Sequence, residues 1–235
     1  MRQIIVMGGG GFSMEPENLA LDRYILDQTH KSTPKICFLP TASGDADGYI
    51  LNFYKAFTTL NCFPTFLSLF RLPIADLESF ILEKDILYVG GGNTRSMLAL
   101  WHEWGLDKHL FTAYRTGVIL AGLSSGASCW FEDCITDALP GKLQVLSCLG
   151  YLKGSFCPHY DSEPERRPSY QGMIQKELLR EGLAADDGAA VHFIDEQLIR
   201  VVSSRPEAKV FRVSRWKGEI QEEALDTQYL DSNIQ

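Results

Sequence analysis

The amino-acid sequence predicts an α/β protein built on a doubly wound, mostly parallel sheet. Short apolar runs alternate with longer amphipathic segments along the first half of the chain, a pattern typical of parallel strands joined by helices. Four of the five strands expected there are continuous apolar runs, as strands covered by helices on both faces should be. With 235 residues and 45% hydrophobic side chains, the chain can bury one large core, so we expect a single domain over residues 1–235.

The elements of the first half follow one another in a regular order. We expect strands at Gln3–Met7, Lys35–Leu39, Thr65–Leu69, Asp85–Val89 and Gly117–Ala121. Helical patterns lie between them, at Asn18–Gln28, Tyr49–Leu60, Ile74–Leu82 and Thr94–Tyr114. Because the strands are separated by helices, the connections are crossovers and the strands should run parallel.

The alternation of strand and helix signals is less regular in the second half of the chain. It predicts two short strands, one helix and then three strands joined by tight turns: Leu143–Cys148, Gly154–Cys157, Tyr170–Glu181, Ala189–Ile194, Leu198–Val202 and Ala208–Arg215. We expect the last three strands to form an antiparallel edge of the main sheet.

Composition and charge exclude several classes of function. The net charge of −8 argues against nucleic acid as a partner, because phosphate contacts need clustered Lys and Arg. The apolar run at the N-terminus is too short for a signal peptide or a membrane span. The six cysteines form no Cys-x-x-Cys pair, which favours free thiols in a reducing cytoplasm, and the histidines have no metal-ligand spacing. We therefore expect a cytoplasmic protein without metal or cofactor; the sequence leaves open whether it forms a homodimer.

The passage from Thr116 to Ala127 carries the strongest functional signal. An apolar strand runs into Gly122-Leu123-Ser124-Ser125-Gly126, which is the Gly-x-Ser-x-Gly pattern of a nucleophile elbow. In such an elbow, a sharp strand-to-helix turn exposes the central serine, and the glycines allow close backbone packing. We expect Ser124 to be a nucleophile and the protein to be a hydrolase or an acyl transferase.

A serine nucleophile needs a base, and His159 is the best placed of the five histidines. It follows a short predicted strand and Pro158, where proline ends the ladder. His192 lies inside the apolar run Ala189–Ile194, so we expect it to be a buried structural residue.

The base in turn needs a carboxylate on its other ring nitrogen. Asp187, in a turn before the strand Ala189–Ile194, is the leading candidate, and Glu132 and Asp133 are the alternatives. Asp161 is near His159 in sequence but lies in a charged segment that we expect to be solvated. The resulting order Ser, His, Asp differs from the Ser, Asp/Glu, His order of α/β-hydrolases.

An oxyanion hole needs two N–H donors, one of which would come from Ser125, directly after the nucleophile. The other would come from the glycine-rich turn Gly90–Asn93, whose residues Gly91 and Asn93 we expect to contact the substrate. A dinucleotide-binding alternative rests on Gly8–Gly11, but the Gly-x-Gly-x-x-Gly pattern would need a glycine where Ser13 stands.

Taken together, four segments resemble peptidase E, a family of serine peptidases that includes α-aspartyl dipeptidase and, more distantly, cyanophycinase. The segments are Gly90–Thr94, Gly122–Ala127, Pro158–Asp161 and Asp187–Ala190, and the similarity runs from about Ile4 to Val213. The resemblance implies a flavodoxin-like sheet akin to that of class I glutamine amidotransferases. It also implies Ser124 as nucleophile, His159 as base, Asp187 as supporting acid, and Gly92 and Ser125 as oxyanion donors.

The chain departs from the family pattern in two places. The common Gly-x-Ser-Ala-Gly is here Gly-Leu-Ser-Ser-Gly, and the family acid is often glutamate where this chain has Asp187. A family preference for N-terminal aspartate would need a cation, for which Arg166 and Arg167 are the candidates. We expect a serine exopeptidase of the dipeptidase type that acts on short peptides. The alternative is an inactive or divergent relative that binds peptides or hydrolyses another acyl substrate.

Overall fold

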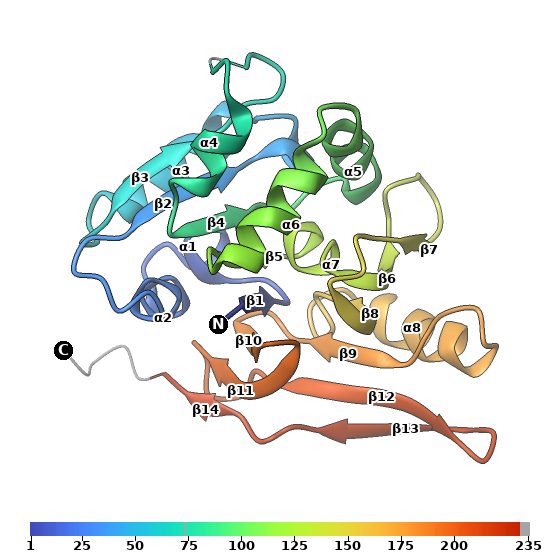
Figure 1. Ribbon diagram of the computed structural model, residues 1–235. Coiled ribbons are helices and arrows are strands. Elements are labelled where there is room, and N and C mark those ends of the chain that lie inside the picture. Colours follow the sequence, from blue (N-terminus) through green and yellow to red (C-terminus); the bar gives the residue numbers. More distant parts are fainter. Residues whose placement is uncertain (73, 231–235) are drawn as a thin grey trace.

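The computed structural model describes residues 1–72 and 74–230 as two mixed sheets with helices packed around them (Figure 1). The main sheet has eight strands. Their order across the sheet is β14 (Gln228–Tyr229), β11 (Gln197–Ser203), β10 (Ala189–Ile194), β1 (Gln3–Met7), β5 (Ile119–Leu123), β4 (Ile86–Val89), β2 (Lys35–Leu39) and β3 (Phe63–Phe66).

Most of the main sheet is parallel. The neighbouring strands β1, β5, β4, β2 and β3 all pair in parallel. Strand β10 pairs antiparallel with β1, and β11 pairs antiparallel with β10. The prediction of an α/β protein with a mostly parallel sheet and antiparallel edge strands is therefore confirmed for these elements.

Helices cover both faces of this sheet. Ile4 and Val6 of β1 are buried on one face, and Ile5 and Met7 are buried on the other. The first face packs against α4 (Leu77–Leu82), α5 (Thr94–Glu103) and α6 (Leu106–Thr116). The second packs against α1 (Gly11–Met14), α2 (Ala20–Asp27) and α3 (Asp47–Phe57). Burial on both faces is why the strands read as continuous apolar runs.

The second sheet has six strands and occupies the lower right of Figure 1. Its order is β13 (Glu219–Ala224), β12 (Val210–Trp216), β9 (Gly182–Ala185), β8 (Leu152–Cys157), β6 (Phe131–Thr136) and β7 (Gln144–Ser147). Helix α8 (Arg166–Gln175) packs against it through Tyr170 and Ile174.

The second sheet corrects one prediction. The segment Ala208–Arg215 was expected at the edge of the main sheet, but β12 pairs antiparallel with β9 instead. Strand β9 has only four residues, and the sequence pattern marks neither β6 nor β9 as a strand. Without β9 as a visible partner, sequence order alone wrongly placed β12 beside β11.

Two helix boundaries also differ from the prediction. The helix expected over Thr94–Tyr114 is interrupted at Gly105, whose φ of 67° is left-handed, so that α5 and α6 are separate helices. The helix expected over Tyr170–Glu181 begins earlier and ends at Gln175, and Glu177 follows with a φ of 58°.

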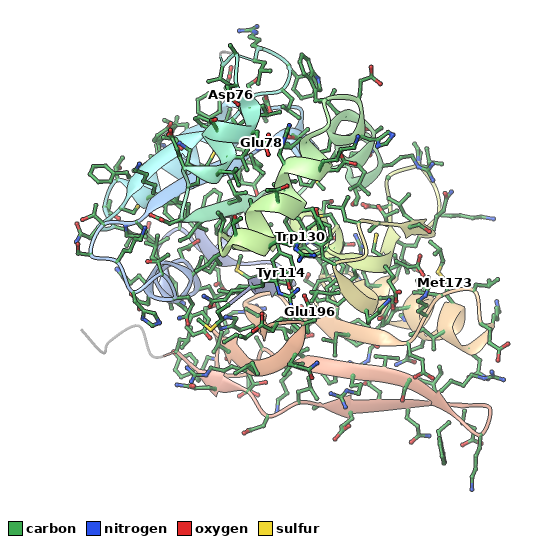
Figure 2. The ribbon with its side chains drawn as sticks, in the orientation of Figure 1. Asp76, Glu78, Tyr114, Trp130, Met173 and Glu196 are labelled. Carbon is green, nitrogen blue, oxygen red and sulfur yellow. The ribbon has the colours of Figure 1, made fainter. Side chains whose placement is uncertain are left out.

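Helix α6 is tied to the antiparallel edge of the main sheet. The hydroxyl of Tyr114 donates a 2.7 Å hydrogen bond to Glu196 in the turn between β10 and β11, and the two side chains point toward each other in Figure 2. None of the helices in the described ranges combines the length and the apolar character needed to cross a bilayer.

Candidate active site

Ser124 lies in a sharp turn between a strand and a short helix. Strand β5 ends at Leu123, and α7 (Ser125–Ser128) begins directly after Ser124, whose φ is 54° and ψ is −119°. The flanking glycines are sterically required, because a Cβ on Gly122 would lie 2.3 Å from the Gly126 carbonyl oxygen. A Cβ on Gly126 would lie 2.2 Å from the Val89 carbonyl oxygen. The turn therefore has the geometry of a nucleophile elbow.

The imidazole of His159 lies between Ser124 and Asp187. Its Nε2 is 2.8 Å from Ser124 Oγ, and its Nδ1 is 2.6 Å from Asp187 Oδ1. His159 follows the end of β8, and Asp187 lies in the turn between β9 and β10. The structure thus brings together the three residues that the sequence selected, in the arrangement of a Ser-His-Asp triad.

The surroundings of Asp187 favour its ionised form. Burial alone raises the pKa of Asp187, but hydrogen bonds from His159 and Ser162 and the Coulomb interactions with His159 and Arg205 outweigh it, so the pKa lies below its usual value. The main-chain N–H of Asp187 donates a 2.9 Å hydrogen bond to Asp161 Oδ1. The Arg205 guanidinium contacts both Asp161 and the main-chain oxygen of Asp187.

The two predicted oxyanion donors, the main-chain N–H groups of Gly92 and Ser125, belong to segments that adjoin Ser124. Ser125 directly follows Ser124, and the Gly90–Asn93 loop lies against the elbow: a Cβ on Gly91 would be 3.2 Å from Ser124 Cβ. Within the described part of the chain, the N–H groups of Gly92 and Ser125 donate no hydrogen bond. Gly92 has a φ of 140°, and a Cβ there would lie 2.2 Å from the Ala42 carbonyl oxygen.

The hydroxyl of Ser125 has a different environment from that of Ser124. It is buried, donates a 2.5 Å hydrogen bond to the Gly92 carbonyl oxygen and accepts one of 2.9 Å from Thr94. These contacts tie the elbow to the glycine-rich loop, whereas the Ser124 hydroxyl contacts the imidazole. Of the two adjacent serines, only Ser124 is paired with a base.

A cavity of about 260 Å³ opens beside Ser124. It is lined by Ser13, Met14, Tyr49, Gly91, Gly92, Leu123, Ser124 and His159. The hydroxyl of Tyr49 accepts a 3.1 Å hydrogen bond from the Gly91 N–H. Sequence reasoning missed Ser13, Met14 and Tyr49, although Ser13 and Met14 follow the Gly8–Gly11 turn at the carboxyl end of β1.

The structure does not bring the other predicted binding residues to this cavity. The Asn93 side chain donates to the Ala138 oxygen and accepts from the Ser96 N–H, both at 2.9 Å, so it caps α5. Arg166 is buried and lies 2.6 Å from Glu163. Arg167 pairs with Glu222 and covers two aromatic rings.

The alternative carboxylates lie elsewhere as well. Glu132 pairs with Lys153, and Asp133 pairs with Arg180. His192 is buried in β10 between Tyr24 and Gln3, at 2.9 and 3.0 Å, and burial lowers its pKa to about 4, which confirms its structural role. Over residues 1–72 and 74–230, no three His, Cys, Asp or Glu side chains are grouped to hold a metal ion.

In comparisons with known proteins, the chain matches a peptidase family and two curated peptidases. The model of peptidase family S51 matches residues 4–201 of the chain. The chain is 58% identical over 230 residues to the uncharacterized peptidase YgaJ of Bacillus subtilis (strain 168), covering 98% of this chain and 100% of that protein. It is 26% identical over 186 residues to peptidase E of Streptomyces coelicolor, covering 76% and 74% of the two chains.

Solved structures show the same fold at low sequence identity. A peptidase from an acI-B1 actinobacterium superposes with a TM-score of 0.70 at 16% identity, covering 96% of this chain and 97% of the other. A putative peptidase E from Listeria monocytogenes EGD-e gives a TM-score of 0.63 at 18% identity, covering 85% and 97%. The family model spans most of the chain, and the chain therefore belongs to peptidase family S51, a family of serine peptidases.

Proposed function

We propose that the protein is a serine exopeptidase of the dipeptidase type, which hydrolyses short peptides through an acyl-enzyme on Ser124. The observation that supports this most directly is the hydrogen-bonded series of Ser124 Oγ, His159 and Asp187, with distances of 2.8 and 2.6 Å. A serine hydroxyl becomes an effective nucleophile when a neighbouring imidazole accepts its proton.

In the proposed mechanism, His159 accepts the Ser124 proton while Oγ attacks the scissile carbonyl carbon. Asp187 holds the imidazole by its Nδ1–H and stabilises the imidazolium that forms. The N–H groups of Gly92 and Ser125 donate to the oxyanion of the tetrahedral intermediate. The imidazolium then protonates the leaving amine, and a water molecule, deprotonated by His159, hydrolyses the acyl-enzyme and restores Ser124.

The small size of the cavity supports short substrates. At about 260 Å³ it is smaller than common ligand pockets, which run from about 300 to 1,000 Å³. Its wall beyond the glycine loop is formed by Met14 and Tyr49, from α1 and α3.

We further propose that this activity is cytoplasmic. All six cysteines are free thiols, four of them buried, although Cys134 Sγ and Cys148 Sγ lie only 3.5 Å apart. Free thiols at this separation are consistent with a reducing compartment.

The proposed chemistry is tested by comparing the protein with its Ser124→Ala variant on a panel of dipeptides and tripeptides, with released amino acids as the readout. Cleavage by the wild type that is lost in the variant is the expected result. A Ser125→Ala variant, which keeps Ser124 and His159, serves as the matched control. Equal cleavage by wild type and Ser124→Ala would contradict the assignment of Ser124.

A further inference from the structure

The proposed function leaves the side chain of the substrate's N-terminal residue undefined. In an acyl transfer to Ser124, the residue whose carbonyl carbon bonds Oγ must lie in the cavity beside Ser124. For a dipeptide this is the N-terminal residue, which brings both its side chain and its α-ammonium group. The charges around this cavity therefore determine which N-terminal residues bind.

The cavity itself offers no cation to a substrate carboxylate. Among the described residues that line it, none is a lysine or an arginine, and His159 is engaged by Ser124 and Asp187. The polar groups that line it are the hydroxyls of Ser13 and Tyr49 and the Gly92 N–H, because the Gly91 N–H already donates to Tyr49. Burial raises the pKa of Tyr49, although hydrogen bonds with Ser13 and the Gly91 N–H oppose this, so the phenol keeps its proton and can donate it.

The neighbouring arginines are already paired with carboxylates of the chain. Arg166 contacts Glu163 and Asp137, and Arg167 contacts Glu222. Arg166 is also enclosed, with only 4% of its side chain exposed, so a substrate could reach it only after Glu163 had moved. Neither arginine lines the cavity.

Arg205, which lies beside Asp187, is also paired with acidic groups. It lies 3.1 Å from Asp161 and 3.5 Å from Glu15, and it contacts the main-chain oxygen of Asp187. Two carboxylates, those of Glu15 and Asp161, therefore contact this guanidinium, and the carboxylate of Asp187, bonded to His159, adds a third negative charge nearby. The net field is negative, which attracts the α-ammonium of a peptide and repels a second carboxylate.

We propose that the protein discriminates against peptides that begin with Asp or Glu and hydrolyses peptides whose N-terminal side chain carries no negative charge. This inference rests on the proposed peptidase function. It differs from the sequence-based hypothesis of a preference for N-terminal aspartate, in which Arg166 and Arg167 were the candidate cations for the substrate carboxylate. The discrimination is electrostatic, because an Asn side chain of the same size lacks the charge and can use the hydroxyls of Ser13 and Tyr49.

The test compares Asn-Leu with Asp-Leu, two dipeptides that differ in charge and hardly in shape. At neutral pH we expect kcat/KM for Asn-Leu to exceed that for Asp-Leu by at least about tenfold, which corresponds to about 1.4 kcal/mol. Hydrolysis of Asp-Leu at the same rate as Asn-Leu, or faster, would overturn the charge selection and leave the peptidase function intact. Failure to cleave any peptide, Ala-Leu included, would overturn both proposals.

A charge introduced into the cavity gives a second test. Met14 lines the cavity and is 48% exposed, so Met14→Arg would place a guanidinium near the substrate side chain without burying it. We expect the Asp-Leu to Asn-Leu ratio of kcat/KM to rise at least about tenfold in this variant. Met14→Gln, which has a similar length and no charge, is the matched control and should leave the ratio unchanged. An unchanged ratio in Met14→Arg would contradict the inference. Because both kcat/KM values are measured with the same variant, a general loss of activity affects them equally and leaves their ratio unchanged.

Discussion

Gly9 lies directly against the carboxylate of Asp187: a Cβ on Gly9 would be 2.1 Å from Asp187 Oδ1 and 2.8 Å from Met14 Sδ. The two residues also form a parallel bridge, and Gly188 donates a 3.0 Å hydrogen bond to the Gly9 oxygen. The glycine turn after β1 thus packs against Asp187 and fixes the position of its carboxylate. This packing explains why position 9 is a glycine, and the explanation requires no bound nucleotide.

Gly9→Ala should displace the Asp187 carboxylate from His159. We expect kcat/KM for the best dipeptide to fall by at least about 10²-fold, because a displacement of about 1 Å in a catalytic group has this effect. Gly172→Ala is the control, since a Cβ there meets nothing within 4 Å and lies in helix α8. If Gly9→Ala kept wild-type activity, Asp187 would not need its observed position.

Asp187→Asn should preserve the shape of the site and remove the charge that stabilises the imidazolium. We expect kcat to fall by about 10⁴-fold, as in serine proteases of the Ser-His-Asp type, with little change in KM. Asp186→Asn, which changes the neighbouring carboxylate, should lose much less, because Asp186 instead accepts a 3.0 Å hydrogen bond from the Lys209 N–H. Equal losses in the two variants would contradict the role of Asp187.

Ser125→Ala should separate the two adjacent serines. The variant loses the link to the Gly92 oxygen and leaves that carbonyl group without its hydrogen bond. We expect kcat to fall by about tenfold, because the glycine-rich loop that carries the Gly92 N–H is then held less firmly against the elbow. Ser124 should remain reactive in this variant, as measured by its rate of labelling with a fluorophosphonate.

The carboxyl group of Asp22 should make the protein less stable as the pH rises. Asp22 is fully buried beneath α1, where burial raises its pKa to about 7 although the Tyr88 hydroxyl donates to it at 3.3 Å. In the unfolded chain its pKa is about 3.9, so the folded state binds the proton more tightly and stability falls between pH about 4 and about 7.

Asp22→Asn removes this titration. We expect the variant to melt at a higher temperature than the wild type above pH about 7, and at a similar temperature below pH about 4. The melting temperature followed across this range by circular dichroism checks the sign. The contradicting result is a melting temperature that rises over this pH range equally in the wild type and in Asp22→Asn. The pKa of Asp22 would then not be raised in the folded protein.

Ser124 and His159 could be selected from the sequence as catalytic candidates because each lies just after the end of a strand. Gly122 and Gly126 mark the elbow, and Pro158 marks the end of β8. Asp187 was selected by its turn before β10. The link from Asp161 to the Asp187 N–H was missed, since Asp161 reads as one of several charges in a polar segment and its partner is 26 residues away.

The five parallel strands were visible because four of them are apolar runs and each is separated from the next by a helix. The second sheet was not, because the sequence pattern does not reveal β6 and β9, with which other strands of that sheet pair. Strand β12, for example, pairs with β9 and β13 on its two sides. Hydrophobic periodicity reports which face of a strand is buried but not which strand lies beside it.

The central claim is that Ser124 is the nucleophile and that His159 activates it. Mass spectrometry of the protein after reaction with a fluorophosphonate tests this most directly. We predict one adduct, located on the peptide segment at Ser124, absent in Ser124→Ala, much slower to form in His159→Ala and retained in Ser125→Ala. An adduct that persists in Ser124→Ala, or that maps to Ser125, would contradict the account.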